Sequence, residues 1–443
     1  MNLIRKEDQS SRSNIDERFI QAHTKIILSG HVIFLNRIES VKNSSNKNLP
    51  LIIWWSDLLY PHEENITEIK CQSGKCLSSK RRKFQNDRDP VAFIIYGTDF
   101  SGEKLPLPRK SNHLWALLHE ESPMNNYIFS HLPGIKLFNY TATFSRESDF
   151  PLTTQFIPSV EYFNERKPVP IVEKNKYRKK GLAPVLYLQS HCNVASDRDR
   201  YVKQLMNFIQ VDSYGKCLHN KDLPPQLLST DTYDKEELFS FISKYKFHIA
   251  FENAICEDYI TEKLYRSLYV GSVPIYKGSY SVKDWLPSNE SVILIDDFKG
   301  PIELAEYIEQ LDQNDYLYNQ YLQFKQQNFK NEFLKDYLSK RHWGVNDPDK
   351  LDFITGFECF VCDKIQNPNQ HVSIANRKHM NCPQPHQSVY TLEVEKNDEW
   401  LEEDWIESYW FAKDHAKAIE DMLQSKENKS SNFVKYISKF KYY

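Results

Sequence analysis

The residues best suited to chemistry lie between positions 246 and 278. The apolar run Phe247–Phe251 predicts a buried strand, and Glu252 and Asn253 follow it directly. Open α/β sheets bind their ligands outside the carboxyl ends of the strands. These two polar side chains are therefore expected where such a sheet would hold a substrate.

A helix is predicted next, over Thr261–Val270, with Gly271 at its end. Thr261 is a favourable N-cap, and Glu262 and Lys263 fall in the first turn. The free N–H groups and the dipole of a helix N-terminus attract anions, and Lys263 adds a full positive charge. A diphosphate could bind at this helix end without a glycine-rich loop.

The segment also has a simpler interpretation. It could be a strand–helix–strand unit whose polar residues only cap the helix or face solvent. Glutamate is common in a first helical turn, whereas Lys263 opposes the dipole and is the unusual residue. From these residues alone, both interpretations stay open.

Glycine is scarce, with 12 in 443 residues, and none of them forms G-x-G-x-x-G or G-x-x-x-x-G-K-[ST]. A dinucleotide fingerprint and a Walker P-loop are therefore excluded. The net charge of −3 argues against a nucleic-acid partner, and 40% hydrophobic with 26% charged residues is typical of a globular chain. A phosphate-bearing ligand would have to be held by side chains and a helix end.

Alternating strands and helices are predicted around this segment. Apolar runs predict buried strands at Leu51–Trp55, Val91–Tyr96, Leu114–Leu118, Ile135–Phe144, Val185–Gln189, Phe247–Phe251, Val273–Tyr276 and Val292–Ile295. Helical patterns lie at Asp197–Ile209, Lys235–Tyr245, Thr261–Val270 and Pro301–Leu311. Such alternation implies parallel sheets covered by helices, hence an α/β class. The polar stretch Asn164–Lys180 predicts a linker between two such units.

The eight cysteines include two close pairs, Cys71/Cys76 and Cys359/Cys362. An even number with close pairs is typical of disulfides in an oxidising lumen. For Cys359 and Cys362, the alternatives are a redox pair, half of a zinc site and a structural disulfide, which is favoured. The other four can pair among themselves, with connectivity left open: Cys192, Cys217, Cys256 and Cys382.

Sequons add to the indication of a lumenal protein. Five occur, at Asn43, Asn65, Asn139, Asn289 and Asn428. No run of about 18 apolar residues predicts a transmembrane helix, and the apolar stretch Ile26–Leu35 does not resemble a signal peptide. The secretory pathway is therefore expected, although no membrane anchor is visible in this sequence.

The segment at 246–278 resembles the signature of the α1,3-fucosyltransferase family, glycosyltransferase family 10, which binds GDP-fucose. The matching residues are Phe251, Glu252, Asn253, Asp258, Tyr259, Ile260, Thr261, Glu262, Lys263, Leu264 and Tyr265. The resemblance covers roughly residues 50–365 and includes blocks at Val211–Cys217, Glu121–Pro123 and Phe144–Asp149. Finer details resemble one branch, alpha-1,3-fucosyltransferases 10 and 11, also described as protein O-fucosyltransferases 3 and 4 acting on EMI-type domains: Trp54-Trp55, His119–Pro123 and Phe357–Asp363.

The resemblance implies a GT-B fold, with two Rossmann-like domains facing across a cleft. The expected parts are a stem-like, poorly structured segment 1–49, an acceptor domain 50–180, a GDP-fucose domain 181–345 and a C-terminal extension 346–443. In the extension, apolar spacing over Glu402–Leu423 predicts a helix packed on the body. Members of the family are type II membrane proteins of the Golgi or endoplasmic reticulum, so a membrane anchor is expected.

By the same resemblance, Glu262 and Lys263 contact fucose and diphosphate, and Asn253 and Tyr259 line the same pocket. The diphosphate is neutralised by a family arginine that Arg198 matches.

Arg200 is the alternative to Arg198. A guanidinium offers phosphate oxygens a planar bidentate fork, and it would stabilise the departing GDP as a divalent metal does elsewhere. Since no D-x-D motif convincingly precedes a sugar site, no obligatory metal is expected.

A catalytic base is also required. Forming an α-fucoside from GDP-β-L-fucose inverts the anomeric centre, so the base must lie opposite GDP, on the other domain. Glu121 follows the predicted strand Leu114–Leu118 and matches the family base. From the sequence alone, a solvated loop carboxylate is the alternative for Glu121, and neighbouring Glu120 is a second candidate base.

These features predict an inverting fucosyltransferase with GDP-fucose as co-substrate and no other cofactor. The expected acceptor is a Ser or Thr hydroxyl on a small folded domain of the EMI type. The alternatives are the 3-hydroxyl of N-acetylglucosamine on a glycan, or a binding protein without catalysis. The presence of Glu121, Arg198, Glu262 and Lys263 argues against a non-catalytic protein.

Overall fold

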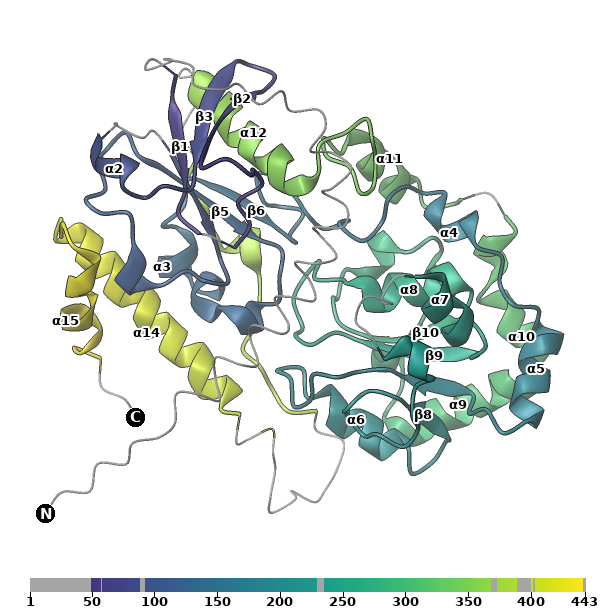
Figure 1. Cartoon of the computed structure of the whole chain (residues 1–443). Coiled ribbons are helices and arrows are strands. Elements are labelled where there is room, and N and C mark those ends of the chain that lie inside the picture. The colour runs from purple at the N-terminus through teal and green to yellow at the C-terminus, as the bar shows by residue number, and fades with distance from the viewer. Residues whose placement is uncertain are drawn as a thin grey trace, which may run out of the picture.

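Two α/β domains, each built on its own sheet, lie side by side (Figure 1). This computed structural model describes residues 49–56, 58–87, 92–228, 235–327, 329–367, 373–388, 400 and 403–440. The expected stem at 1–49 therefore lies almost wholly outside the described residues. Among the described residues, no helix is both long enough and apolar enough to cross a membrane.

The first sheet has the strand order β2-β3-β1-β4-β5-β6. Neighbouring strands are parallel, except that β2 and β3 form an antiparallel pair. The strands are β1 (Leu51–Trp54), β2 (Ile66–Lys70), β3 (Lys75–Ser79), β4 (Ala92–Tyr96), β5 (Leu114–His119) and β6 (Tyr140–Thr143). The central strands are buried on both faces, which explains their continuous apolar runs.

The second sheet is parallel throughout, in the order β11-β10-β9-β7-β8. Its strands are β7 (Val185–Tyr187), β8 (Val211–Ser213), β9 (Phe247–Phe251), β10 (Val273–Lys277) and β11 (Ile293–Leu294). The helices around it include α4 (Tyr162–Glu165), α5 (Ile171–Lys179), α6 (Arg198–Leu205), α7 (Glu236–Ile242), α8 (Glu262–Val270), α9 (Pro301–Gln313), α10 (Asp315–Gln320) and α11 (Glu332–Lys340).

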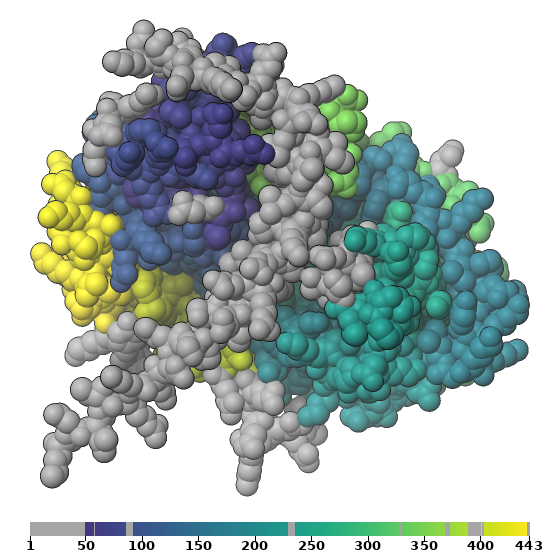
Figure 2. Space-filling view, viewed as in Figure 1, coloured from purple at the N-terminus to yellow at the C-terminus, as the bar shows by residue number. Residues whose placement is uncertain are grey.

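Helices from the C-terminal extension cover both faces of the first sheet. They are α12 (Phe353–Gln366), α14 (Trp405–Gln424) and α15 (Phe433–Ile437). Alternate residues of β1 point to opposite faces, so Ile52 packs in the cluster of Phe357 from α12, and Ile53 in that of Ile419 from α14. The extension therefore completes the core of the first domain, and Figure 2 shows α14 and α15, in yellow, against the blue first domain.

Two disulfides fasten α12 to the β2–β3 pair. Cys71 is bonded to Cys359 and Cys76 to Cys362, across 288 and 286 residues of sequence. The prediction that all four are disulfide cysteines is confirmed. The bonds join one close pair to the other, however, so Cys359 and Cys362 form neither a redox pair nor half of a zinc site.

Some element predictions were wrong. Only Tyr140–Thr143 of the predicted strand Ile135–Phe144 is a strand, and α3 (Leu132–Ile135) occupies its beginning. Ile135, Leu137 and Phe138 are buried in the core, and apolar residues alone do not distinguish a buried turn from a buried strand. Strands β2, β3 and β8 were missed.

The predicted linker is largely helical. Helix α5 spans Ile171–Lys179, and its Lys174 is fully buried beside the second sheet. The Lys174 Nζ donates to the carbonyl oxygens of Tyr245 and Gly271 at 2.7 and 2.9 Å. A charged residue that looks solvent-exposed in the sequence thus holds α5 on the second domain. The predicted helix over Glu402–Leu423 is confirmed as α14.

Candidate active site

Glu121 lies at the carboxyl edge of the first sheet. Strand β5 ends at His119, and Ser122 then caps a short 3-10 helix by accepting a hydrogen bond from Met124 N at 3.3 Å. This turn stops the chain at the sheet edge and leaves Glu121 half-buried. Its carboxylate is therefore reachable by a substrate at this edge.

Glu120 has a very different environment. It is 6% exposed, and its Oε1 accepts a hydrogen bond from the Tyr96 hydroxyl at 3.2 Å. Burial, reinforced by the charge of Glu121, raises the pKa of Glu120 to about 8. Of the two candidate carboxylates, the half-buried Glu121 is thus the better placed to meet an acceptor.

The second domain presents the N-terminus of α8 at the carboxyl edge of its sheet. Thr261 caps α8 by accepting from Lys263 N at 3.4 Å. The fully buried Glu252, which follows β9, accepts from both the backbone N and the Oγ1 of Thr261 at 2.7 Å. Glu252 therefore ties the helix N-terminus to the end of β9.

Lys263 extends its amine over this helix end. Its Nζ donates to Thr261 Oγ1 at 3.0 Å and lies 3.2 Å from Glu262 Oε1 and 3.6 Å from Glu252 Oε2. Burial raises the pKa of Glu252 and Lys263 opposes that rise. The result is a cation at a helix N-terminus, the arrangement that the sequence predicted for binding a diphosphate.

Tyr259 lies between the two edges. It is 3% exposed, and its ring packs against that of Phe144 in the first domain, with centroids 5.0 Å apart. Burial and the carboxylates of Glu252, Glu121 and Glu262 raise the pKa of its hydroxyl well above the usual value. Carboxylates from both domains thus act on one side chain, so the two edges meet at Tyr259.

Asn253 is buried beside this junction. It is 8% exposed, and its Oδ1 has no hydrogen-bond partner in the described part of the chain. Buried amide oxygens are normally satisfied, so this atom is available to a ligand.

The predicted diphosphate arginine lies beneath the site surface. Arg198 is 1% exposed, and its two terminal nitrogens donate to the carbonyl oxygens of Phe251 and His191 at 3.0 and 2.8 Å. Its Nε has no hydrogen-bond partner among the residues described. Arg198 therefore supports the end of β9, while Arg200 pairs with Asp197 at 2.6 Å.

Cysteine and carboxylate groups can bind a metal only where their ligand atoms lie close together. One cluster in the described ranges brings Cys192, Asp199 and Cys217 together. The two sulfurs form a disulfide with each other, so they offer no thiolate to a metal. A fourth disulfide joins Cys256 to Cys382, and the predicted pairing of these four cysteines among themselves is confirmed.

The sequons differ in exposure. Asn65, Asn289 and Asn428 are exposed, whereas Asn43 lies outside the described residues. The Asn139 side chain accepts from Trp115 N at 2.9 Å and donates to Ser373 O at 3.2 Å. Since a glycan would be attached to that donating nitrogen, Asn139 is built into the fold rather than presented for glycosylation.

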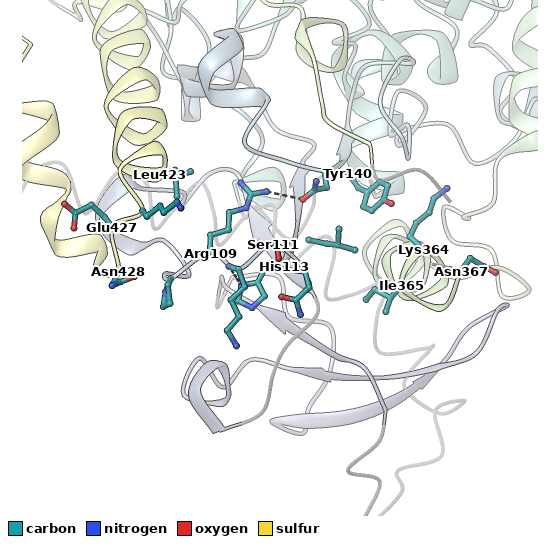
Figure 3. Close-up of a pocket in the computed structure, with 16 residues that line it drawn as sticks. Arg109, Ser111, His113, Tyr140, Lys364, Ile365, Asn367, Leu423, Glu427 and Asn428 are labelled. Atoms are coloured by element: carbon teal, nitrogen blue, oxygen red, sulfur yellow. Dashed lines mark hydrogen bonds between the residues drawn. The ribbon is translucent and has the colours of Figure 1, made fainter. Parts of the chain in front are cut away.

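A wide cavity lies at the opposite edge of the first sheet (Figure 3). Among its lining residues, Arg109 donates to Leu137 O at 2.8 Å and stacks on Trp115 at 4.2 Å, so this cation already serves the fold. Strand β5 runs from Leu114 at this cavity to His119 near Glu121. The cavity is therefore a strand's length from the interdomain junction.

Sequence reasoning assigned no role to several residues at the junction. Asp258 was recognised only as part of the motif, and Arg146 only as part of a block. The Arg146 guanidinium pairs with Asp258 at 2.7 Å and with Asp284 at 2.8 Å. No spacing pattern signals such pairs, because their members are more than one hundred residues apart.

Two Rossmann-like domains whose carboxyl strand edges meet form the architecture that is called GT-B in glycosyltransferases. The model named "Fucosyltransferase, N-terminal" matches residues 47–155, and "Glycosyltransferase family 10 (fucosyltransferase) C-term" matches residues 176–379. The chain therefore belongs to glycosyltransferase family 10, the fucosyltransferases.

Two relatives of high sequence identity agree with this assignment. GDP-fucose protein O-fucosyltransferase 3 of Gallus gallus is 44% identical over 389 residues, covering 86% of this chain and 81% of that protein. The Homo sapiens protein of the same name is 44% identical over 392 residues, with the same coverage of 86% and 81%. A crystal structure of an α1,3-fucosyltransferase with GDP covers 78% of this chain and 96% of that chain, at 16% identity and a TM-score of 0.40.

Proposed function

We propose that this fucosyltransferase transfers L-fucose from GDP-β-L-fucose, with inversion, to a Ser or Thr hydroxyl of a small folded domain of the EMI type. The observation that carries the proposal is the position of Tyr259, whose ring lies 5.0 Å from that of Phe144 in the first domain and whose hydroxyl pKa is raised by the carboxylates of Glu121 and Glu262. A candidate base and the donor-binding helix end thus border one site. The relatives named GDP-fucose protein O-fucosyltransferase 3 support a protein acceptor.

In the proposed reaction, Glu121 accepts the proton of the acceptor hydroxyl as its oxygen attacks the anomeric carbon of fucose. The bond from that carbon to the diphosphate breaks on the opposite face, toward the second domain. Lys263 and the N–H groups at the start of α8 stabilise the negative charge on the departing GDP. Glu262 holds fucose, and Asn253 and Tyr259 line its pocket.

Arg198 has a more limited role in this proposal. Its two terminal nitrogens each donate one N–H to a backbone carbonyl, which leaves the second N–H of each and the Nε–H as the donors that the diphosphate could use. Because these cationic groups already neutralise the leaving group, the reaction needs no obligatory metal. Transfer should therefore continue in the presence of a metal chelator.

The disulfides support an oxidising compartment for this enzyme. Four bonds join all eight cysteines, and such bonds persist in an oxidising lumen. We place the enzyme in the secretory pathway, in the Golgi or endoplasmic reticulum, where GDP-fucose and a glycoprotein or folded-domain acceptor are its partners. Asn65, Asn289 and Asn428 are its accessible glycosylation sites.

The test uses the purified full chain with GDP-fucose and two separate acceptors, a folded EMI domain and N-acetyllactosamine. Fucose on a Ser or Thr of the domain is the expected product. Transfer only to the sugar would establish the alternative acceptor. Transfer to neither, without hydrolysis of GDP-fucose, would contradict catalysis by this chain.

A further inference from the structure

The chain between β9 and α8 carries two residues of the proposed fucose pocket. Asn253 lies near its start and Tyr259 near its end. Between them, the donor loop, residues 254–258, forms neither helix nor strand. Irregular backbone has no ladder of hydrogen bonds to hold it, so other contacts must fix the donor loop. Those contacts decide where Asn253 and Tyr259 lie.

A strap from the C-terminal extension, residues 373–388, is anchored on the first domain. Ala375 N donates to Phe138 O at 2.9 Å. Thr143 Oγ1, on β6, donates to His379 O at 2.5 Å. Strand β6 is the edge strand of the first sheet, so its outer side has no neighbouring strand and can take such contacts. The first part of the strap is therefore fixed beside that edge.

The next residues of the strap hold the donor loop of the second domain. Cys382 forms a disulfide with Cys256, across 126 residues of sequence, and both cysteines are 1% exposed. Asn381 Nδ2 donates to Glu257 Oε2 at 3.1 Å, and Glu257 N donates to Asn381 O at 3.4 Å. Two consecutive residues of the strap are thus bonded to two consecutive residues of the donor loop.

The last residue of the donor loop is held from the first domain. Arg146 N donates to Asp258 Oδ2 at 3.0 Å, in addition to the ion pair between their side chains at 2.7 Å. Asp258 has a φ of 62°, which residues other than glycine rarely adopt and which surrounding contacts must maintain. Residues 256–258 are therefore each bonded to the strap or to the first domain.

A buried acceptor atom beside the donor loop shows why these bonds matter. Asn253 is 8% exposed, and its Oδ1 has no hydrogen-bond partner among the described residues. A buried acceptor without a partner costs free energy, so an untethered loop would rearrange to satisfy it. Bonds from the strap and from Arg146 oppose such a rearrangement and leave this oxygen available to a ligand.

We propose that Asn381 and Cys382 are positioning residues for the donor sugar, because they hold the donor loop in the conformation that places Asn253 and Tyr259 against fucose. This inference rests on the proposed function, in which the fucose comes from GDP-fucose. A loop already held in its binding conformation loses less conformational freedom when the sugar binds. Without the bonds to the strap, only a fraction of the molecules has the loop in place, and the apparent affinity falls by that fraction.

The diphosphate end of the donor should be affected much less. Lys263 and the N-terminus of α8 lie outside the donor loop, and Glu252 and Thr261 fix them through their own hydrogen bonds. Loss of the strap bonds should therefore weaken the binding of GDP-fucose more than the binding of GDP. This difference separates positioning of the sugar pocket from a general loss of structure in the second domain.

Two variants of the full chain test the proposal, with whichever acceptor the unmodified enzyme fucosylates. Cys256→Ser/Cys382→Ser should raise the KM for GDP-fucose by about three- to tenfold. Asn381→Ala should raise it by about two- to threefold, because it removes one exposed hydrogen bond. Saturating GDP-fucose returns the loop to its binding conformation, so kcat should stay within about twofold. The Kd for GDP, measured by calorimetry, should also stay within about twofold.

Matched controls remove the same kinds of bond elsewhere. Cys71→Ser/Cys359→Ser removes a disulfide on the first domain, and Asn432→Ala breaks an exposed hydrogen bond to Glu427. Neither bond involves the strap or the donor loop. Both controls should keep the KM for GDP-fucose of the unmodified enzyme.

An unchanged KM for GDP-fucose in both test variants would overturn the inference. An equal loss of GDP affinity would also overturn it, because the strap would then support the second domain as a whole. If the cysteine variant does not fold, Asn381→Ala decides alone. If the unmodified enzyme transfers fucose to neither acceptor, the proposed function fails and this inference fails with it, whereas normal donor kinetics in the variants refute this inference alone.

Discussion

Arg146 of the first domain holds Asp258 of the second in a bidentate ion pair, with Nη2 2.7 Å from Oδ1 and Nε 2.9 Å from Oδ2. Asp258 has a positive φ of 62° and directly precedes Tyr259. Burial alone would raise the pKa of Asp258, but bonds from Arg146 and Ser281 outweigh it and lower that pKa. The pair therefore couples the positions of the two domains to the loop that carries the donor motif.

Loss of this pair should destabilise the protein. Arg146→Ala leaves the 1%-exposed Asp258 without its cation, and we expect a loss of about 2–3 kcal/mol, below the range for fully buried pairs because the Arg146 side chain is 22% exposed. Chemical denaturation measures this loss. Lys340→Ala, which breaks an exposed pair with Asp336, is the matched control and should cost about 0.5 kcal/mol or less. Equal losses of stability in the two variants would show that the Arg146–Asp258 pair contributes no more than an exposed ion pair.

Substitutions should distinguish the roles of the two neighbouring carboxylates, Glu120 and Glu121. Glu121→Gln removes the proposed base and should lower kcat by about 10²- to 10⁴-fold, with GDP binding intact. Glu120→Gln keeps an uncharged group at the Tyr96 bond and should retain most activity. Transfer rates with saturating donor, together with calorimetric GDP titration, make the comparison. Full activity of Glu121→Gln, or loss only in Glu120→Gln, would reverse the assignment.

Glu120 also predicts a pH dependence of stability. Its folded-state pKa of about 8 lies above the ordinary value of 4.5, so between these values the folded protein keeps a proton that the unfolded chain releases. Its contribution to stability is therefore lost progressively as pH rises from about 4.5 to 8. Thermal unfolding across this range should show a shallower decline for Glu120→Gln than for the unmodified protein. Parallel curves would contradict the raised pKa.

The losses of stability on removing the two neighbouring disulfides, Cys71–Cys359 and Cys76–Cys362, should not be additive. Cys76–Cys362 already closes a loop of 286 residues, so the adjacent Cys71–Cys359 restricts the unfolded chain only slightly more. Cys71→Ser/Cys359→Ser should therefore lower Tm only a little, whereas removal of both bonds should cost about 3–5 kcal/mol. Calorimetry of the two single-bond variants and the double variant provides the test. A sum of single effects equal to the double effect would contradict this account.

Short sequence patterns correctly predicted much of the secondary structure of the second domain. The run Phe247–Phe251 is β9 as predicted, and Thr261 caps a helix that ends before Gly271. Both depend on burial, capping and a left-handed glycine, which act over a few residues. The same reasoning failed for Lys174, because its burial depends on carbonyls at Tyr245 and Gly271 that only the fold brings close.

The candidate site likewise combines features that short segments predict with features that depend on the fold. The sequence by itself identified the donor motif around Lys263, excluded glycine-rich phosphate loops and indicated an α/β fucosyltransferase, because these features reside in contiguous residues. Only the tertiary structure decided that Glu120 is buried beside a half-buried Glu121, that Arg198 lies beneath the surface, and that the disulfide Cys256–Cys382 joins the C-terminal extension to the second domain. Burial and contacts between distant segments depend on how the two domains and the extension pack, and no spacing along the chain records that packing.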